Sequence, residues 1–207
     1  VLVDLKYGTG WDRVTKSQII KVNNNSIEGF RFSKGWAADQ RVFFFTEFSK
    51  NIINFEIVRS DDEIGEITAL IEFEGNGELM VKTAISPVST EGAHNNMLAE
   101  IDEELGLWNF DGVREMAKTK WNTELGKIRI ETTNQADKTT FYTSLYHTMI
   151  APNLYNDTNG DYLGTDKEIY TDPGFDNYTV FSLWDTYRAA HPLFTLVQPN
   201  RVNDFVN

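Results

Sequence analysis

The sequence predicts a multidomain α+β protein in which an antiparallel β-sandwich precedes a mainly helical region. Two observations carry this prediction. Residues 1–88 contain short strand-like segments with turn-forming residues between them, which is typical of an antiparallel sandwich. From residue 89 onward, apolar residues recur at helical spacing. Because strands and helices are grouped and do not alternate, a parallel α/β sheet is not expected.

Two turn signals organise the strand segments. The Asn run at 23–25 tolerates positive φ and predicts a hairpin between the strands on either side of it. The Gly-Asn-Gly sequence at 75–77 predicts a second hairpin. The expected strands cover residues 1–5, 18–22, 26–32, 41–48, 52–58, 67–73 and 78–85.

Capping and breaking residues set the bounds of the expected helices. Ser89 or Thr90 can cap the first helix, and Gly106 can end it. Proline disfavours helix continuation, so Pro152 and Pro192 are expected to end the third and fourth helices. The expected helices cover about residues 90–105, 111–128, 135–150 and 181–190, and another opens at 200–207.

Composition excludes several classes of function. The net charge of −12, from 19 basic and 31 acidic residues, argues against a nucleic-acid partner, whose phosphates need a basic surface. The absence of cysteine excludes disulfides, cysteine-based zinc sites and a thiol nucleophile. The chain has no apolar run of about 18 residues that could span a membrane. It also has no Gly-rich phosphate loop and no serine nucleophile elbow.

The segment 178–193 is the best candidate for a binding site. It places Asp185 and Arg188 among aromatic residues that include Trp184. A carboxylate accepts hydrogen bonds from sugar hydroxyls, a guanidinium donates them, and an aromatic ring covers the apolar face of a sugar. The alternative is that Asp185 pairs with Arg188 at i,i+3 of one helix and only orders the segment.

Four other motifs have plainer explanations. The Asp-Thr-Asn-Gly-Asp sequence at 157–161 matches part of a calcium loop but lacks the distal Glu ligand, so a polar turn is expected. His147 is expected to be a hydrogen-bonded structural residue and not a general base. The acidic run at 100–104 is expected to be a solvated helix face, and Trp36 is expected to pack against its neighbours.

Several segments occur together in a characteristic order. They are ISPVS at 85–89, WNTEL at 121–125, FYTSLYH at 141–147, DY at 161–162, YTVFSLWDTYR at 178–188, HPL at 191–193 and QP at 198–199. In this order they resemble the bacterial calcium-dependent α-mannosidases of glycoside hydrolase family 92. The resemblance spans nearly the whole chain and is strongest over 135–199.

The resemblance implies a fold and a division of the chain. Residues 1–88 would be the C-terminal part of a β-sandwich domain, 89–130 a helical linker, and 131–207 the first helices of an (α/α)6 catalytic barrel. Trp184 and Asp185 would contribute to the pocket for the non-reducing mannose, with Arg188 buried behind Asp185. Trp36 could reach the same pocket, because the family lines it from both domains.

The resemblance also implies an activity. The parent protein would be an inverting exo-α-mannosidase that uses Ca²⁺, is periplasmic or extracellular, and releases mannose from glycans. Its catalytic acid, catalytic base and main calcium ligands are expected beyond residue 207, so the 207 residues alone should be inactive. Their barrel face is expected to contact the remainder of the polypeptide or to self-associate. The alternative is a non-catalytic carbohydrate-binding or structural sandwich protein.

Overall fold

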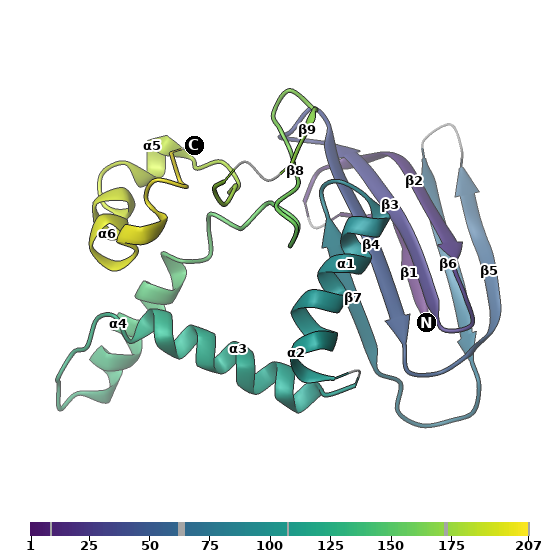
Figure 1. Ribbon diagram of the computed structural model, residues 1–207, viewed down its shortest axis with the longest axis horizontal. Helices are drawn as coiled ribbons and strands as arrows, with labels where there is room; N and C mark the ends of the chain where they lie inside the picture. The colour runs from purple at the N-terminus through teal and green to yellow at the C-terminus, as the bar shows by residue number, and fades with distance from the viewer. Residues whose placement is uncertain (9, 62–64, 107, 172–173, 207) are drawn as a thin grey trace. The chain divides into compact units, whose positions relative to one another are not determined.

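The computed structural model describes residues 1–8, 10–61, 65–106, 108–171 and 174–206 (Figure 1). The chain forms two compact units. The first unit contains Val1–Trp108 together with Asp157–Thr171, and the second contains Asn109–Asn156 together with Asp172–Asn207. Residues distant in sequence therefore join the first unit.

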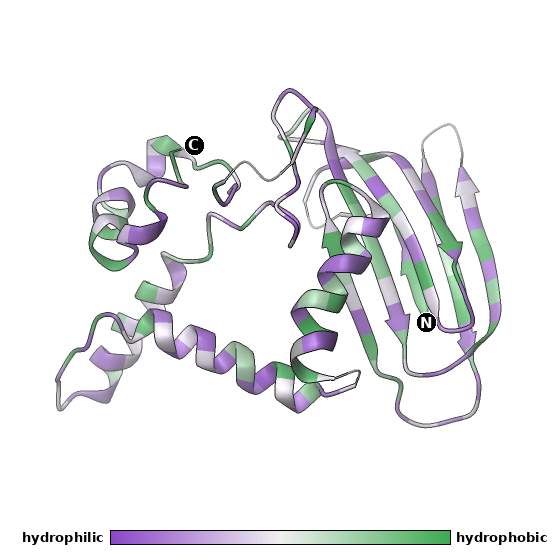
Figure 2. Cartoon of the chain, in the orientation of Figure 1, coloured by the Kyte–Doolittle hydropathy of each residue, from purple (hydrophilic) through white to green (hydrophobic). Residues whose placement is uncertain are grey.

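Two antiparallel sheets form the body of the first unit. One sheet has the order β1-β6-β5 and the other the order β2-β3-β4-β7. Their strands are β1 (Leu2–Asp4), β2 (Arg13–Lys21), β3 (Ser26–Lys34), β4 (Gln40–Phe48), β5 (Ile52–Asp61), β6 (Glu66–Phe73) and β7 (Val81–Ser86). Hydrophobic and hydrophilic residues mix along these strands (Figure 2).

The core of the first unit lies between the two sheets. Ile27 and Phe48 from one sheet and Ile71 from the other are each at most 1% exposed and belong to one cluster of buried residues. Burying such side chains contributes roughly 1.5–3 kcal/mol each. The expected antiparallel β-sandwich followed by helices is confirmed at this level.

The Asn run at 23–25 forms the expected hairpin turn. It joins β2 to β3, and the Asn25 backbone N–H donates to the Asn23 side chain over 2.8 Å. The second expected hairpin, at 75–77, is wrong. Because β6 is already paired with β1 and β5, the strand that follows cannot pair with it, and β7 joins β4 in the other sheet. Gly75 and Gly77, with φ of +70° and +101°, lie in the connection between the sheets.

Helix α1 (Thr90–Met97) packs against the outer face of the second sheet. The Ser89 side chain caps it by accepting from the Gly92 N–H over 2.9 Å, as expected. Ala93 and Met97 are buried against Phe45. A π-helical turn (Leu98–Asp102) and α2 (Glu103–Leu105) follow, and α2 ends at Gly106, whose φ is +77°.

A buried lysine ties this helical turn to the sheet. Lys82 on β7 is 8% exposed, and its ammonium lies 2.8 Å from Glu47 and 2.7 Å from Asp102. It also lies 4.6 Å from the centre of the Trp108 ring. The acidic run at 100–104 is therefore not wholly a solvated face, because Asp102 neutralises a cation that the sheet buries.

The second unit contains four helices among its described residues. They are α3 (Phe110–Leu125), α4 (Gln135–His147), α5 (Leu183–Thr186) and α6 (Ala190–Val197), followed by a 3-10 turn (Pro199–Arg201). Asn109 caps α3 and Asn134 caps α4. The expectation that Pro192 ends a helix is wrong. Pro192 lies in the first turn of α6, where the missing backbone donor has no intrahelical acceptor to lose.

No helix in the described part of the chain is long and apolar enough to cross a membrane.

Gly29 in the middle of β3 leads to a stability prediction. A Cβ at Gly29 would lie 2.0 Å from the Gln18 carbonyl oxygen and 2.8 Å from the Phe44 ring. Because backbone cannot yield as a flexible side chain can, Gly29→Ala should lower the free energy of unfolding by about 2 kcal/mol or more. Gly10→Ala is the matched control, since a Cβ there meets no atom within 4 Å. Urea unfolding of both variants measures the difference, and equal midpoints would contradict the argument.

Candidate functional site

An exposed tryptophan pair lies on the first unit. Trp11 is 65% exposed and Trp36, in the loop between β3 and β4, is 93% exposed. Their ring centres are 6.1 Å apart, at an interplanar angle of 56°. The expectation that Trp36 packs against its neighbours is wrong. Two large aromatic faces turned to solvent are typical of a binding surface, because an aromatic side chain without such a role is usually mostly buried.

Paired charges accompany these rings. Asp12, the neighbour of Trp11, lies 2.6 Å from the Arg31 guanidinium, and that hydrogen bond holds the pKa of Asp12 below its usual value. Arg31 also donates to the Leu5 carbonyl over 2.9 Å, which fixes its position. In the loop of Trp36, Asp39 pairs with Arg41 over 2.8 Å. The surface therefore combines aromatic faces, carboxylates and guanidinium groups.

The sequence contains one local signal for this surface. Trp11-Asp12 repeats the Trp-Asp pair found at Trp184-Asp185, and glycines at 8 and 10 lie just before it. The same pairing of an aromatic residue with a carboxylate predicted the candidate site at Trp184-Asp185, so it could have marked Trp11-Asp12 as well. No comparable local pattern in the sequence predicted that Trp36 would be exposed.

A buried carboxylate anchors a later segment to the sandwich. Asp157 is 3% exposed and accepts from Ser86 Oγ over 2.7 Å and from Asn96 Nδ2 over 2.8 Å. Asn96 Oδ1 in turn accepts from the Thr158 N–H over 2.8 Å. Gly92 makes room for the cluster, since a Cβ there would lie 2.3 Å from Asp157 Oδ2. Burial raises the pKa of Asp157, against the lowering effect of its two donors.

The segment 157–161, which matches part of a calcium loop, forms a polar turn. Backbone hydrogen bonds close the segment into a turn, from the Asp157 N–H to the Asp161 carbonyl and from the Gly160 N–H to the Asp157 carbonyl. Each carboxylate oxygen of Asp157 accepts a protein hydrogen bond, so the first residue of the motif is held by side chains of the sandwich. The residues that the structure describes contain no group of three or more His, Cys, Asp or Glu that could hold a metal ion.

The structure places the predicted sugar-binding residues on and just after α5. Trp184 is 83% exposed, and the exposed Asp185 carboxylate accepts from Ser182 Oγ over 2.6 Å. Arg188 is exposed, not buried as expected, and its Nε donates to the Tyr187 hydroxyl over 2.7 Å. Within the described residues, no ion pair joins Asp185 to Arg188, so the alternative of a simple i,i+3 pair has no support.

His147 lies at the end of α4 and is exposed. Its ring centre is 5.8 Å from that of Tyr146. His147 therefore lies beside Tyr146 with its side chain exposed.

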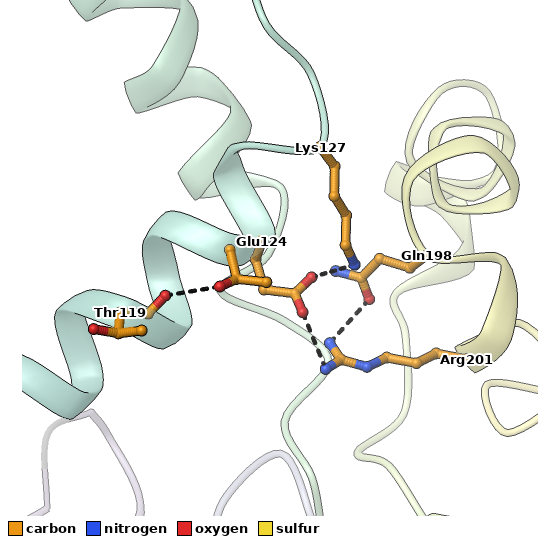
Figure 3. Close-up of polar contacts among 6 residues, drawn as sticks. Thr119, Glu124, Lys127, Gln198 and Arg201 are labelled. Carbon is orange, nitrogen blue, oxygen red and sulfur yellow. Dashed lines mark hydrogen bonds and ion pairs between the residues drawn. The ribbon is translucent and has the colours of Figure 1, made fainter.

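The second unit contains a cavity of about 730 Å³ that the sequence did not predict. Its apolar lining includes Trp121, Met149, Pro152, Tyr178, Phe194 and Phe205. Figure 3 shows the polar contacts at its edge, where the Glu124 carboxylate meets Lys127 over 2.6 Å and Arg201 over 3.4 Å. Arg201 also lies 3.3 Å from the Gln198 side-chain oxygen. Neither Trp184 nor Asp185 is among the lining residues.

Comparisons with known proteins now identify the family. The model of the glycosyl hydrolase family 92 N-terminal domain matches residues 1–86, and the model of the family 92 catalytic domain matches residues 92–207. The chain therefore belongs to glycosyl hydrolase family 92. A comparison with curated proteins finds no match.

Solved structures of the family agree. A family 92 α-mannosidase from Bacteroides thetaiotaomicron is 36% identical, with a TM-score of 0.88, and the match covers 100% of this chain and 29% of that chain. The same enzyme in complex with mannoimidazole gives the same identity and TM-score, with 100% and 28% covered. An inverting mannosidase of the family from Bacteroides thetaiotaomicron VPI-5482 is 26% identical, with a TM-score of 0.77 and 96% and 28% covered. The chain thus spans less than a third of the length of these structures.

The raised pKa of Asp157 gives a pH-dependent prediction. Because the folded pKa lies above the unfolded one, the native state favours the protonated carboxyl, and the stability that this contributes is lost as pH rises. Asp157→Asn removes the titrating carboxyl. It should also lower the free energy of unfolding by an amount that does not change with pH, because the new amide faces the Asn96 donor. From about pH 3 to about pH 6, the unfolding free energy of wild type should fall relative to that of Asp157→Asn. Thermal or urea unfolding across this range measures the difference, and a difference that stays constant or moves the other way would refute the assignment.

Proposed function

We propose that this chain is part of an inverting exo-acting α-mannosidase that releases mannose from glycans. The observation that carries the proposal is the 36% identity to a family 92 α-mannosidase over the whole chain. The complex of that neighbour with mannoimidazole adds support for a mannose-like ligand. The Trp11–Trp36 pair beside Asp12 and Arg31 supplies the mixture of aromatic faces and charged groups that sugars need.

Trp184, Asp185 and Arg188 are the proposed contacts for the terminal mannose. The indole of Trp184 can cover the apolar face of the sugar, because it is exposed. Ser182 holds the Asp185 carboxylate by a hydrogen bond, so the acceptor is oriented before the sugar arrives. Arg188 lies over the Tyr187 ring at 5.2 Å, which limits the directions in which it can donate.

The proposed hydrolysis follows the inverting route. One carboxylic acid protonates the leaving oxygen, and a carboxylate about 6.5–9.5 Å away activates water on the opposite face of the sugar. We place that pair, and the residues that bind Ca²⁺, in the part of the enzyme beyond residue 207. The support is the fraction of the solved mannosidase, 29%, that this chain matches. Residues 1–207 alone are therefore proposed to be inactive, and no step is assigned through calcium.

The parent enzyme is proposed to act in the periplasm or outside a bacterial cell. The support is its proposed substrate class, together with the Bacteroides source of its relatives.

A non-catalytic carbohydrate-binding protein is the second candidate, because the exposed Trp11–Trp36 pair suits sugar binding with or without hydrolysis. Such a protein would bind mannosides without hydrolysing them. Hydrolysis by the full-length gene product separates the two candidates.

The first test is the reaction itself. The full-length gene product should hydrolyse an α-mannoside and release β-mannose first, which proton NMR of the initial product detects. Asp185→Ala should lower kcat/KM on the order of 100-fold, because the sugar hydroxyls lose a charged acceptor. Thr186→Ala is a neighbouring control that keeps the carboxylate. A kcat/KM within about twofold of wild type for Asp185→Ala would make the residue peripheral.

Apolar side chains of the second unit are proposed to be covered by another surface. Leu145 is buried, but Phe141, Met149 and Phe181 are partly exposed and Leu183 is 64% exposed. Helix α3 has no buried residue. The proposed cover is the remainder of the polypeptide or, when that is missing, a second copy of this chain.

The oligomeric state of the 207-residue chain tests that proposal. Exposed apolar patches above a few hundred Å² favour association, so light scattering should show species larger than a monomer. Leu183→Glu together with Leu196→Glu should shift the population toward monomer, since both side chains are exposed, at 64% and 78%. A stable wild-type monomer at all concentrations would contradict the expectation.

A further inference from the structure

Asp12 connects the two loops that carry the exposed tryptophans of the first unit. It follows Trp11 directly in the sequence. It also lies against Gly35, which directly precedes Trp36, because a Cβ on Gly35 would lie 3.0 Å from Asp12 Cβ and 3.2 Å from Asp12 Cα. The neighbours of the two indoles are therefore in contact, and a contact that fixes Asp12 fixes both loops.

Two side chains of β3 hold the Asp12 carboxylate. Arg31 Nη1 donates to Asp12 Oδ2 over 2.6 Å, and Arg31 Nε donates to the Leu5 carbonyl over 2.9 Å. One planar guanidinium thus fastens the segment before β2 to β3 at two points. Ser33, which lies two residues further along β3 and is 2% exposed, is a second hydrogen-bond partner of Asp12. All of these contacts lie within the first unit.

The loop that carries Trp36 has an anchor of its own. Lys167 Nζ donates to the Asp39 carbonyl over 2.7 Å. Lys167 lies in the hairpin of β8 (Tyr162–Leu163) and β9 (Ile169–Tyr170), which belongs to the same unit. The backbone that follows Trp36 is therefore fixed as well as the backbone that precedes it.

The spacing of the two indoles determines how a sugar can contact them. A sugar ring between two parallel indoles needs a van der Waals contact of about 3.5–4.0 Å on each face, and hence ring centres about 7–8 Å apart. The centres of Trp11 and Trp36 are 6.1 Å apart, and the rings are tilted by 56°. A sugar would therefore lie across both rings and not between them. Such a contact depends on the angle at which the two rings are held.

We infer that Arg31 is a positioning residue: acting through Asp12, it holds the two exposed indoles as one preformed site for a sugar. The inference rests on the proposed function for the identity of that sugar, a mannoside. Loops that are already ordered lose less conformational freedom on binding, so Arg31 increases affinity without touching the sugar. A plainer role is that the ion pair of Arg31 and Asp12 only stabilises the sandwich. That role would leave the arrangement of the indoles unchanged when the pair is removed.

Circular dichroism tests the positioning. Two tilted indoles at this distance couple their electronic transitions and give paired bands of opposite sign, which Trp36→Phe removes. In the full-length gene product, the difference between wild type and Trp36→Phe should show these bands. The same difference in an Arg31→Ala background should lose most of their amplitude, because the relative orientation of the rings is no longer fixed.

A pair of glycine variants tests the same point without removing a charge. Gly35→Ala crowds Asp12, whereas a Cβ at Gly10, which also directly precedes a tryptophan, meets no atom within 4 Å. Gly35→Ala should therefore weaken the paired bands, and Gly10→Ala should keep them. Lys6→Ala is the control for the loss of an ion pair, since Lys6 pairs over 2.8 Å with Glu66 of β6.

Fluorine NMR tests the sugar. The full-length gene product labelled with fluorotryptophan gives a signal for each indole, and Trp11→Phe and Trp36→Phe assign the two signals of interest. Titration with methyl thio-α-mannoside, which resists hydrolysis, should shift both signals with one common Kd. Arg31→Ala should raise that Kd about fivefold, and Lys6→Ala should leave it within about twofold of wild type.

Each outcome decides the inference. Paired bands that are absent from wild type, that persist in Arg31→Ala, or that weaken equally in Gly35→Ala and Gly10→Ala overturn the positioning role. If Arg31→Ala does not fold, Gly35→Ala takes its place in both measurements.

The titration also separates this inference from the proposed function. If the enzyme hydrolyses α-mannosides and neither indole signal shifts, the inference fails and the proposed function stands. If both signals shift and no hydrolysis occurs, the proposed function fails and the sugar site stands. A Kd that Arg31→Ala leaves unchanged overturns the inference in either case.

Discussion

One buried carboxylate, that of Asp157, ties the later segment Asp157–Thr171 to the sandwich. Asp157 is sequence-distant from the sheets, yet its two oxygens accept hydrogen bonds from β7, through Ser86, and from α1, through Asn96. Removing a carboxylate from water is costly unless such donors replace the solvent, so the site admits little variation. The same contact requires glycine at position 92, because any side chain there would collide with Asp157. The strand, the helix and the later segment are thereby held as one body.

In this unit, the residues that stabilise the fold are different from those proposed to bind a ligand. Its core lies between the sheets and consists of aliphatic and aromatic side chains such as Ile27, Phe48 and Ile71. Recognition is proposed for the loops, where Trp11 and Trp36 stand in solvent. Loops held by a rigid sandwich can present large aromatic faces without disturbing the packing beneath them. The segment Asp157–Thr171 belongs to the same unit and is joined to it through the buried Asp157.

The sequence predicted what depends on neighbouring residues and failed where distant pairing decides. The turn at 23–25 and the Ser89 cap need only a few adjacent residues, and both are as expected. The turn at 75–77 carried an equally strong local signal, but β6 has partners on both edges, and no local pattern records that. The prediction of which side chains are buried failed for a similar reason. Trp36 is apolar enough for a core and Asp102 polar enough for a surface, yet the fold exposes the first and pairs the second with a buried lysine.

In the helical unit, too, local sequence patterns predict helices but not the burial of their residues. The stripe of apolar residues in α3 is helical in its spacing, and the helix forms, yet none of its residues is buried. The spacing of apolar residues thus predicts an apolar helix face, but it does not predict which surface covers that face. Trp184 and Asp185 are in the same position, because their types suit a sugar while their surroundings expose them. Uncovered hydrophobic side chains on ordered helices fit the proposal that another surface packs on them, and a pocket around Asp185 would then close only with that surface in place.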